Sequence, residues 1–231
     1  MKQNDLTEEM QAYLLKHKNE LLSQIIQYDE LMNRYDSAIK EVTTKLEILK
    51  SDLRLRNNRD CISAIQTRIK SPISILKKLN QKGLPPTLDS IQNELNDVAG
   101  IRVICSFIDD IYMLAEKISG QDDITVIAVK DYIKHPKENG YRSYHMVLEV
   151  PVFFSESKEL VRVEVQIRTV AMDFWASLEH DIKYKKDIQN KEEIVKGLKE
   201  CADTINRTDL RMMELRNQAM DGNRKMYTAQ P

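Results

Sequence analysis

Apolar residues near the start of the chain recur at alternating steps of four and three. The stripe comprises Leu21, Ile25, Tyr28, Met32, Tyr35, Ile39, Val42, Leu46, Leu49 and Leu53. This alternation lines up side chains along one side of an α-helix, and it is also the repeat of a coiled coil. One unbroken helix over residues 21–53 would be roughly 50 Å long. The stripe suits either a self-association surface or a core-facing helix, and the pattern alone favours neither.

The middle of the chain has short apolar runs separated by glycine, proline and polar turns. These runs predict four strands, over residues 100–107, 124–129, 143–150 and 160–168. Pro151 and the polar residues 155–158 are expected to connect the last two strands as a hairpin. Asp109 and Asp110 are expected to cap a helix over about residues 111–119. Two further helices are predicted over residues 169–186 and 191–219.

Together these elements predict an α+β fold. We expect a mixed β-sheet of about four to five strands, with helices packed on one face and helices at both ends of the chain. The organisation is then an N-terminal helical arm over residues 1–60, a core over residues 61–186 and a C-terminal helical extension over residues 187–231.

Charge and composition exclude several classes of protein. The 231 residues carry a net charge of -1, so nothing global indicates a nucleic-acid partner. No apolar run approaches the ~18 residues of a membrane helix, and the first residues lack a signal-peptide pattern. Cys61, Cys105 and Cys201 are far apart, which predicts reduced thiols instead of a disulfide framework. We therefore expect a cytoplasmic protein that has no membrane partner.

The densest chemistry lies in residues 134–145, which combine basic groups, tyrosines, histidines and a Pro/Gly-bounded turn. Lysine and arginine suit phosphate charge, tyrosine suits stacking on a base, and glycine allows close backbone approach. About twenty residues later, the alternation in residues 161–168 places Arg162, Glu164, Gln166 and Arg168 on one strand face. The two segments together predict a nucleotide-handling site.

Two carboxylates are candidates for holding a metal ion. Asp97 precedes the first predicted strand and Glu164 lies in the middle of the fourth, so the two converge if these strands are neighbours. Mg²⁺ is typically bound by one or two carboxylates together with substrate phosphates. Taken singly, Asp97 could be a turn-capping residue and Glu164 part of a solvated strand face.

Basic residues suited to phosphate fall into three groups: Arg68, Lys70, Lys77 and Lys78; Arg102; and Lys130, Lys134, Lys137 and Arg142. Arg102 lies in an apolar strand, where an unpaired charge is costly, so a functional or ion-paired role is expected. The glycine-rich motifs of P-loop and Rossmann proteins do not occur, and the four histidines have no metal-site spacing. The spacing of Trp175 with Met172 and Leu178 predicts core packing.

Three segments in order carry a family resemblance: Asn96-Asp97-Val98-Ala99-Gly100-Ile101-Arg102-Val103, Asn139-Gly140-Tyr141-Arg142-Ser143-Tyr144-His145 and Val163-Glu164-Val165-Gln166-Ile167-Arg168-Thr169. They resemble the nucleotidyltransferase-like synthetase domain of the RelA/SpoT family over roughly residues 68–186. The length is similar to that of stand-alone small alarmone synthetases of the RelP/RelQ kind. The resemblance implies transfer of pyrophosphate from ATP to the 3′-OH of GDP or GTP, giving AMP and ppGpp or pppGpp, with Mg²⁺ as cofactor.

The resemblance also implies roles for individual residues. Asp97 and Glu164 would ligate Mg²⁺, and Glu164 would act as the base toward the 3′-OH, or do both. Nucleotide contacts would come from Arg68, Lys70, Lys78 and Arg102 for ATP, and from Tyr141, stacked on guanine, with Lys137, Asn139, His145 and Lys130 for GDP or GTP. Gln166, Arg168 and Arg142 would support these groups.

The resemblance further implies a homotetramer that synthesises the alarmone and does not degrade it, because the hydrolase motif of longer relatives does not occur. Control by the alarmone or by single-stranded RNA stays open. The alternatives are a non-catalytic guanine-nucleotide sensor that uses the same pocket, a single-stranded RNA-binding regulator, and a structural helical scaffold. The pair Asp97 and Glu164 argues against a sensor, and the near-zero net charge argues against RNA binding.

Overall fold

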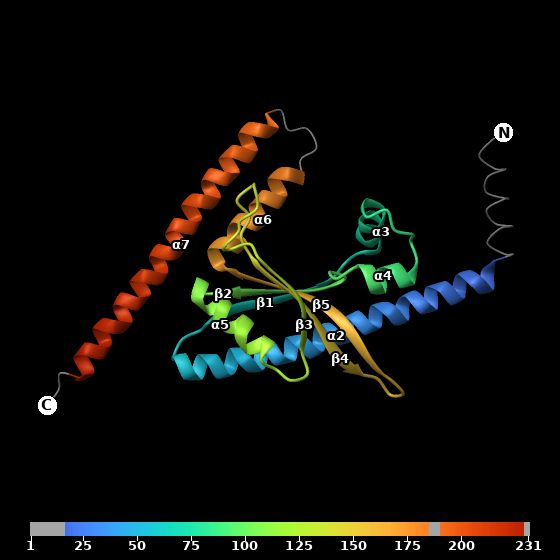
Figure 1. Cartoon of the computed structure of the whole chain (residues 1–231), viewed down its shortest axis with the longest axis horizontal. Coiled ribbons are helices and arrows are strands. Elements are labelled where there is room, and N and C mark those ends of the chain that lie inside the picture. The colour runs from blue at the N-terminus through green and yellow to red at the C-terminus, as the bar shows by residue number, and fades with distance from the viewer. Residues whose placement is uncertain (1–16, 185–189, 229–231) are drawn as a thin grey trace.

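The N-terminal stripe belongs to one long helix that packs on a sheet. The computed structural model describes residues 17–184 and 190–228, and helix α2 covers Lys18–Asn57. From Tyr35 onward the stripe is buried apart from the partly buried Leu49, and Tyr35, Val42 and Leu46 belong to the hydrophobic core beneath the sheet. This part of the stripe therefore faces the core. The first turns of α2 extend past the sheet and leave apolar side chains exposed (Figure 1).

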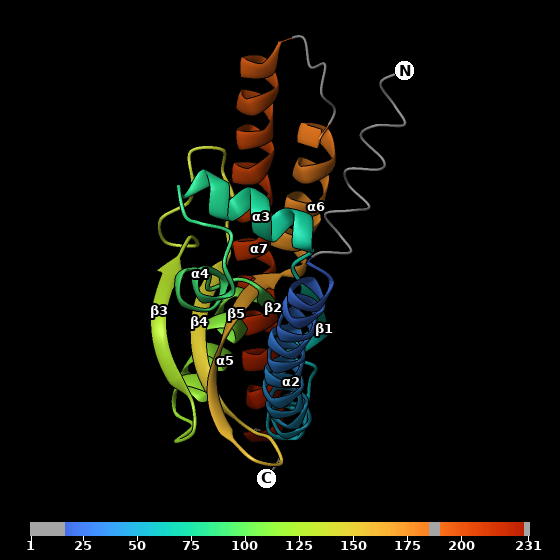
Figure 2. The ribbon, with the colours of Figure 1, turned by 90° about the vertical axis from the view of Figure 1, so that its right-hand side faces the viewer.

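The sheet has five strands and is mixed, as predicted. The strands are β1 (Ile62–Ile69), β2 (Ala99–Cys105), β3 (Thr125–Asp131), β4 (Tyr144–Phe153) and β5 (Lys158–Thr169). Their order in space is β1-β2-β5-β4-β3 (Figure 2). Strands β2 and β5 pair in parallel, while the β1–β2, β5–β4 and β4–β3 pairs are antiparallel. The parallel pair lies at the centre of the sheet, where it aligns residues far apart in the sequence.

Two details of the strands differ from the prediction. Strand β1 was not predicted, because it is an edge strand in which only Ile62 is fully buried, so its sequence lacks a clear alternation. The expectation that Pro151 lies in the connection was also wrong: Pro151 is within β4, opposite Leu160. Strand β3 pairs with β4 only as far as Glu149, so Pro151 lies where β4 has become an edge, which is where a strand tolerates proline.

The remaining helices surround the sheet. They are α3 (Pro72–Gln81), α4 (Leu88–Glu94), α5 (Ile108–Ser119), α6 (Val170–Tyr184) and α7 (Lys191–Thr228). Helix α5 begins before its predicted start, with Phe107 as its N-cap; Asp109 and Asp110 lie in its first turn, where acidic groups favour the positive end of the helix dipole. Helix α7 runs beyond its predicted end at Ala219. The predicted end of α6 at Lys186 lies outside the described residues.

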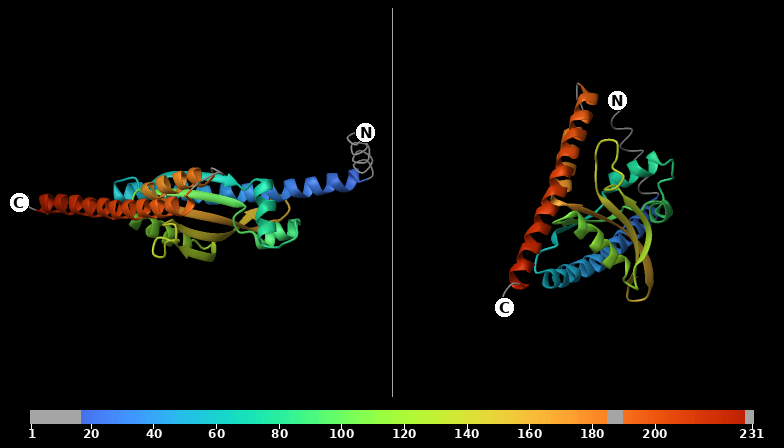
Figure 3. Two further views of the ribbon diagram at one scale, coloured as in Figure 1. Left: turned by 90° about the horizontal axis from the view of Figure 1, so that it is seen from above. Right: turned by 60° about the vertical axis from the view of Figure 1, so that its left-hand side comes forward.

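The two faces of the sheet have different chemistry. Along β5, Val163, Val165 and Ile167 are fully buried, whereas Glu164 and Gln166 are only partly buried. The apolar face packs against α2 and α5, which also contact each other. Helix α6 and the loop before β4 border the polar face. Among the described residues no helix is long and apolar enough to cross a membrane. Helices α2 and α7 project from opposite ends of the molecule (Figure 3).

Candidate active site

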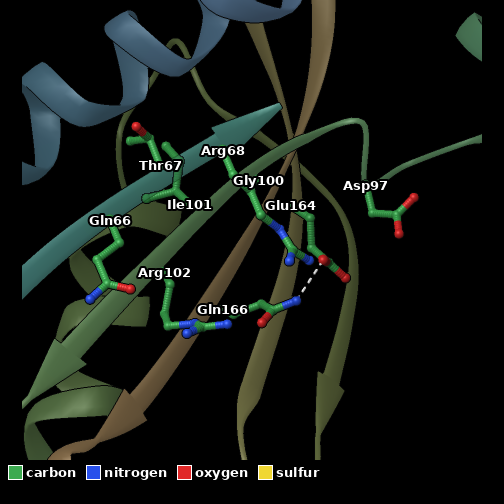
Figure 4. A pocket seen from close by; sticks show the side chains of 9 residues that line it. All are labelled: Gln66, Thr67, Arg68, Asp97, Gly100, Ile101, Arg102, Glu164 and Gln166. Atoms are coloured by element: carbon green, nitrogen blue, oxygen red, sulfur yellow. Dashed lines mark hydrogen bonds between the residues drawn. The ribbon is translucent and has the colours of Figure 1, made fainter. Parts of the chain in front are cut away.

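The parallel pairing of β2 with β5 brings the two predicted carboxylates to one cavity. Gly100 lies opposite Glu164, and Asp97 is in the turn that leads into β2. Both carboxylates line a cavity of about 220 Å³ on the polar face of the sheet. Figure 4 shows Arg68, Arg102, Glu164 and Gln166 gathered at its centre and Asp97 at its margin. The cavity is also lined by Gln66, Thr67, Gly100 and Ile101.

Asp97 has one paired and one unpaired oxygen. Its Oδ2 accepts hydrogen bonds from the Nζ atoms of Lys70, at 2.8 Å, and Lys78, at 2.6 Å. Its Oδ1 is buried and has no hydrogen-bond partner. Burial by itself raises the pKa of Asp97, but the two lysines outweigh this and hold the pKa below its ordinary value. Asp97 is therefore ionised at neutral pH, with one oxygen left to bind a cation.

Glu164 is also held as a carboxylate. Its Oε2 accepts a hydrogen bond from Gln166 Nε2 at 2.8 Å, and its Oε1 lies 3.4 Å from His145 Nδ1. Burial by itself raises the pKa of Glu164, but the contacts from His145 and Gln166 lower it by more. The pKa of Glu164 therefore lies below its ordinary value. In the described part of the chain no three acidic, histidine or cysteine side chains form a closed metal site. Two ionised carboxylates and one unpaired oxygen fit Mg²⁺, which completes its shell with water and phosphate.

A second and larger cavity adjoins the first. Its volume is about 690 Å³, and it shares Arg68, Arg102 and Gln166 with the smaller cavity. The rest of its lining comes from the loop before β4, from β4 and β5, and from α6: Lys137, Asn139, Tyr141, His145, Arg168, Ala176, Ser177, Glu179, His180 and Asp181. Two compartments that meet at shared basic and amide groups suit a reaction between two charged ligands.

A hydrogen-bonded chain joins the larger cavity to Glu164. The hydroxyl of Tyr141 lies 2.9 Å from His145 Nε2, and His145 contacts Glu164 through its other ring nitrogen. Arg168, which is almost fully buried, donates to the Tyr141 hydroxyl at 2.6 Å and to Asp173 at 3.1 Å. The position of Tyr141 is therefore coupled to that of Glu164 through the His145 ring. The contact with Glu164 requires the proton on Nδ1 of His145, because an ionised carboxylate can only accept a hydrogen bond.

Cations cover the ring of Tyr141. Lys137 Nζ lies 4.9 Å from the centre of this ring and 4.7 Å from that of Tyr132, and the Arg168 guanidinium lies 5.1 Å from the Tyr141 ring. Lys137 is exposed and makes no ion pair with a described residue, so it can move aside for a base, whereas Arg168 is held by Asp173. A planar ligand can thus stack on Tyr141 by replacing Lys137.

The other predicted nucleotide-binding residues divide into two groups. Arg68 is exposed at the boundary of the two cavities, Arg102 pairs with Asp173 at 3.3 Å, and Asn139 donates to Glu179 at 3.0 Å. Lys130 and Arg142 do not join them. Lys130 pairs with His145 across β3 and β4 but lines neither cavity, and Arg142 is turned toward α7.

Three features of the site were not predicted. Asp173 orients both Arg102 and Arg168, and α6 supplies one wall of the larger cavity, including His180 and Asp181, which the sequence suggested were only helix surface. Arg162 donates hydrogen bonds to Asn93 and to Asn96, the residue just before Asp97. One sequence feature could have identified Asp173: it lies in the first helical turn after β5, a strand that carries arginines. Trp175 is buried, as predicted.

Sequence comparison decides the family. Residues 67–189 match the model described as the region found in RelA / SpoT proteins. The chain belongs to the RelA/SpoT family. Among curated RelA/SpoT relatives it is similar to GTP pyrophosphokinase YwaC of Bacillus subtilis (strain 168), with 39% identity over 184 residues, 80% of this chain and 88% of the relative.

Solved structures of small alarmone synthetases have the same fold. The crystal structure of small alarmone synthetase 1 from Bacillus subtilis bound to its product pppGpp has a TM-score of 0.76 and 34% identity, covering 83% of this chain and 97% of that one. The structure of the same synthetase bound to AMPCPP has a TM-score of 0.69 and 30% identity, covering 84% of this chain and 99% of that one. The predicted α+β fold of the RelA/SpoT synthetase domain is confirmed.

Proposed function

We propose that the protein is a (p)ppGpp synthetase, a GTP diphosphokinase. It transfers pyrophosphate from ATP to the ribose 3′-OH of GDP or GTP, giving AMP and ppGpp or pppGpp, the alarmones of the stringent response. The observation that carries the proposal is the pair of adjoining cavities that share Arg68, Arg102 and Gln166, with two ionised carboxylates in the smaller cavity. Its family supports the proposal: a similar protein is named GTP pyrophosphokinase, and similar structures are described as bound to pppGpp and to AMPCPP.

We assign ATP to the smaller cavity. Arg68 and Arg102 would contact the adenine or the phosphates, and Lys70 and Lys78 would add positive charge beside Asp97. The attacked atom is the β-phosphorus, so the bond between the α-phosphate and the β-phosphate breaks and AMP leaves. Because the protein forms no covalent intermediate in this scheme, it contributes positioning and charge neutralisation.

We assign GDP or GTP to the larger cavity. Guanine would stack on Tyr141 in the place now held by Lys137, which would then be free to meet phosphate oxygens. Asn139 and His145 would lie beside the nucleotide. Lys130 lies on the neighbouring strand and lines neither cavity, so we assign it only a contribution to the positive potential.

We assign Glu164 as the residue that accepts the proton of the 3′-OH. It is ionised, it lines the smaller cavity, and His145 connects it to the larger one. A general base must lie within hydrogen-bond reach of the proton that it removes, and a ribose bound at the boundary between the cavities would bring its 3′-OH toward Glu164. Asp97 and Glu164 would hold Mg²⁺, which when bound neutralises charge on the transferred phosphates. Gln166 and Arg168 keep Glu164 and Tyr141 in place.

The deciding experiment is incubation of the purified protein with Mg²⁺, labelled ATP and GDP or GTP, followed by nucleotide separation. We expect AMP and a guanosine 3′-diphosphate. Glu164→Gln should abolish synthesis while nucleotide binding survives. Glu116→Gln is a matched control, because the Glu116 side chain is 79% exposed on α5. Full turnover by Glu164→Gln would remove Glu164 from the mechanism, whereas a wild-type protein that binds nucleotide without turnover would favour the sensor function.

We further propose that the protein is a homotetramer in the cytoplasm. Support comes from the first turns of α2, where Leu22, Ile25 and Ile26 are each about half exposed or more although they are large and apolar. Light scattering at micromolar concentration should give the mass of a tetramer, and substitution of these three residues by serine should lower it. A wild-type monomer would contradict the assembly. Whether alarmone or single-stranded RNA changes activity can be tested in the same assay.

A further inference from the structure

One end of the loop before β4 is anchored to the C-terminal helix. We call residues 132–143 the basic loop. The side chain of Arg142 points away from both cavities: its Nη2 pairs with Asp203 Oδ1 at 3.0 Å, and its Nη1 donates to the carbonyl oxygens of Ala202, at 3.3 Å, and Gly140, at 3.1 Å. The Arg142 side chain is only 13% exposed. The arginine thus connects the basic loop to α7 instead of contacting a ligand.

The backbone of the basic loop also touches α7 directly. Gly140 has φ +88°, and a Cβ added there would lie 2.5 Å from Ala202 Cβ and 3.4 Å from Lys199 Cα. That first distance is too short for two carbon atoms, so Gly140 has to lack a side chain, for steric reasons as well as for its backbone conformation. The same contact requires residue 202 to be small.

This anchoring acts on the residue between the two contacts. Tyr141 lies between Gly140 and Arg142, and it packs in a small cluster with Trp175, Leu198 and Ala202. Trp175 donates from Nε1 to the Leu198 carbonyl oxygen at 2.9 Å, which joins α6 to α7 behind the tyrosine. The ring of Tyr141 therefore has α6 and α7 behind it and the larger cavity in front.

We infer that residues 198–203 of α7, the α7 contact segment, position the basic loop and so set the affinity for the guanine nucleotide. Ala202 and Asp203 are positioning residues that act through Gly140, Arg142 and Tyr141. No described residue that lines the smaller cavity forms a hydrogen bond with α7, so we expect the affinity for ATP to change little. The inference rests on the proposed function for the identity of the two nucleotides.

Two variants and a matched control test this role. Asp203→Asn removes the partner of Arg142, and we expect the KM for GDP or GTP to rise by about threefold to fivefold, as for a partly exposed ion pair. Ala202→Leu should displace Gly140 and raise the same KM by roughly tenfold or more. Glu200→Gln removes one charge from an exposed site in the same helical turn and should change nothing. The KM for ATP should stay within about twofold in all three.

The fluorescence of Trp175, the single tryptophan, separates positioning from unfolding. Its emission should be unchanged in Asp203→Asn, because the α6–α7 contact is intact. If Ala202→Leu fails to fold, the KM for the guanine nucleotide in Asp203→Asn still tests the inference. Arg142→Ala combined with Asp203→Asn should raise the KM for the guanine nucleotide no more than Arg142→Ala alone, because both act through one contact.

The inference is overturned if Asp203→Asn leaves the KM for the guanine nucleotide unchanged, or if the KM values for ATP and for the guanine nucleotide rise together. Failure of the proposed function gives a different result. Calorimetric titration with GDP, in buffer with Mg²⁺ and without ATP, measures binding independently of turnover. A wild-type protein that makes no product, with GDP binding weakened selectively by Asp203→Asn, would reject the synthetase and support the positioning role.

Discussion

Removing Arg162 should weaken catalysis although this residue lines neither nucleotide cavity. Arg162 lies two residues before Glu164 on β5, and its Nη1 donates to the Asn93 carbonyl oxygen at 3.0 Å and to Asn96 Oδ1 at 3.1 Å. Asn96 directly precedes Asp97. Arg162 therefore joins the strand that carries one carboxylate to the loop that carries the other. In Arg162→Ala we expect that loop to loosen.

The magnitude follows from the two hydrogen bonds. A hydrogen bond from a charged donor contributes about 1.5–3 kcal/mol when it is buried. The Arg162 side chain is 32% exposed, so we take about 1 kcal/mol for each bond, or about 2 kcal/mol in all. In a chain of this length that loss lowers Tm by about 4–8 °C. If about 1.4 kcal/mol of it is used to position Asp97, kcat falls about tenfold.

The assay measures kcat, both KM values and Tm for the wild type, Arg162→Ala and Arg162→Lys. Lysine keeps the charge but cannot reproduce the geometry of the guanidinium, so we expect an intermediate kcat. Arg211→Ala removes an arginine whose side chain is 60% exposed and serves as the control. A variant Arg162→Ala with lowered Tm but wild-type kcat would show that the loop needs no such support, and the reasoning would be wrong.

Three further predictions can be checked with standard assays. Tyr141→Ala should raise the KM for GDP or GTP by about tenfold or more through lost stacking, with little change for ATP; an unchanged KM would exclude stacking. Asp97 and Glu164 have lowered pKa values in the folded protein, so the stability that they contribute is present above their ordinary values of 3.8 and 4.5 and is lost as pH falls through the folded values. The pKa of Asp209 is raised by burial, so the stability that Asp209 contributes is present at low pH and is lost as pH rises through the folded value. The fall of folding stability with decreasing pH should therefore be shallower in Asp97→Asn and steeper in Asp209→Asn. Purified pppGpp incubated with the protein and Mg²⁺ or Mn²⁺ should stay intact, and its loss would reveal a hydrolase activity.

Much of the fold could be predicted because local patterns report burial. The four predicted strands are present, and the long apolar stripe does form one helix. Its two interpretations could not be separated, since a stripe on a sheet and a stripe in a coiled coil use the same spacing. Strand β1 was missed because an edge strand buries few residues, and Pro151 was misplaced because its tolerance depends on where β3 ends.

The candidate site was predictable where one short segment carries several functional groups. Residues 137–145 and 164–168 contain most of the side chains that line the larger cavity apart from those of α6. Arg142 illustrates the limit. Its sequence neighbours suggested support of a ligand site, yet it pairs with Asp203, about sixty residues away, because the turn at Gly140 directs it toward α7.

By itself the sequence determined which residue types are available, their periodicity and, through three ordered motifs, the family. These are local properties of the chain, and they survive in a string of letters. Only the tertiary structure decided that β2 lies parallel to β5, which places Asp97 and Glu164 in one cavity, and that α7 lies behind the basic loop. Such contacts depend on strand order and on the approach of distant backbones, which are set by packing of the whole core and not by any one segment.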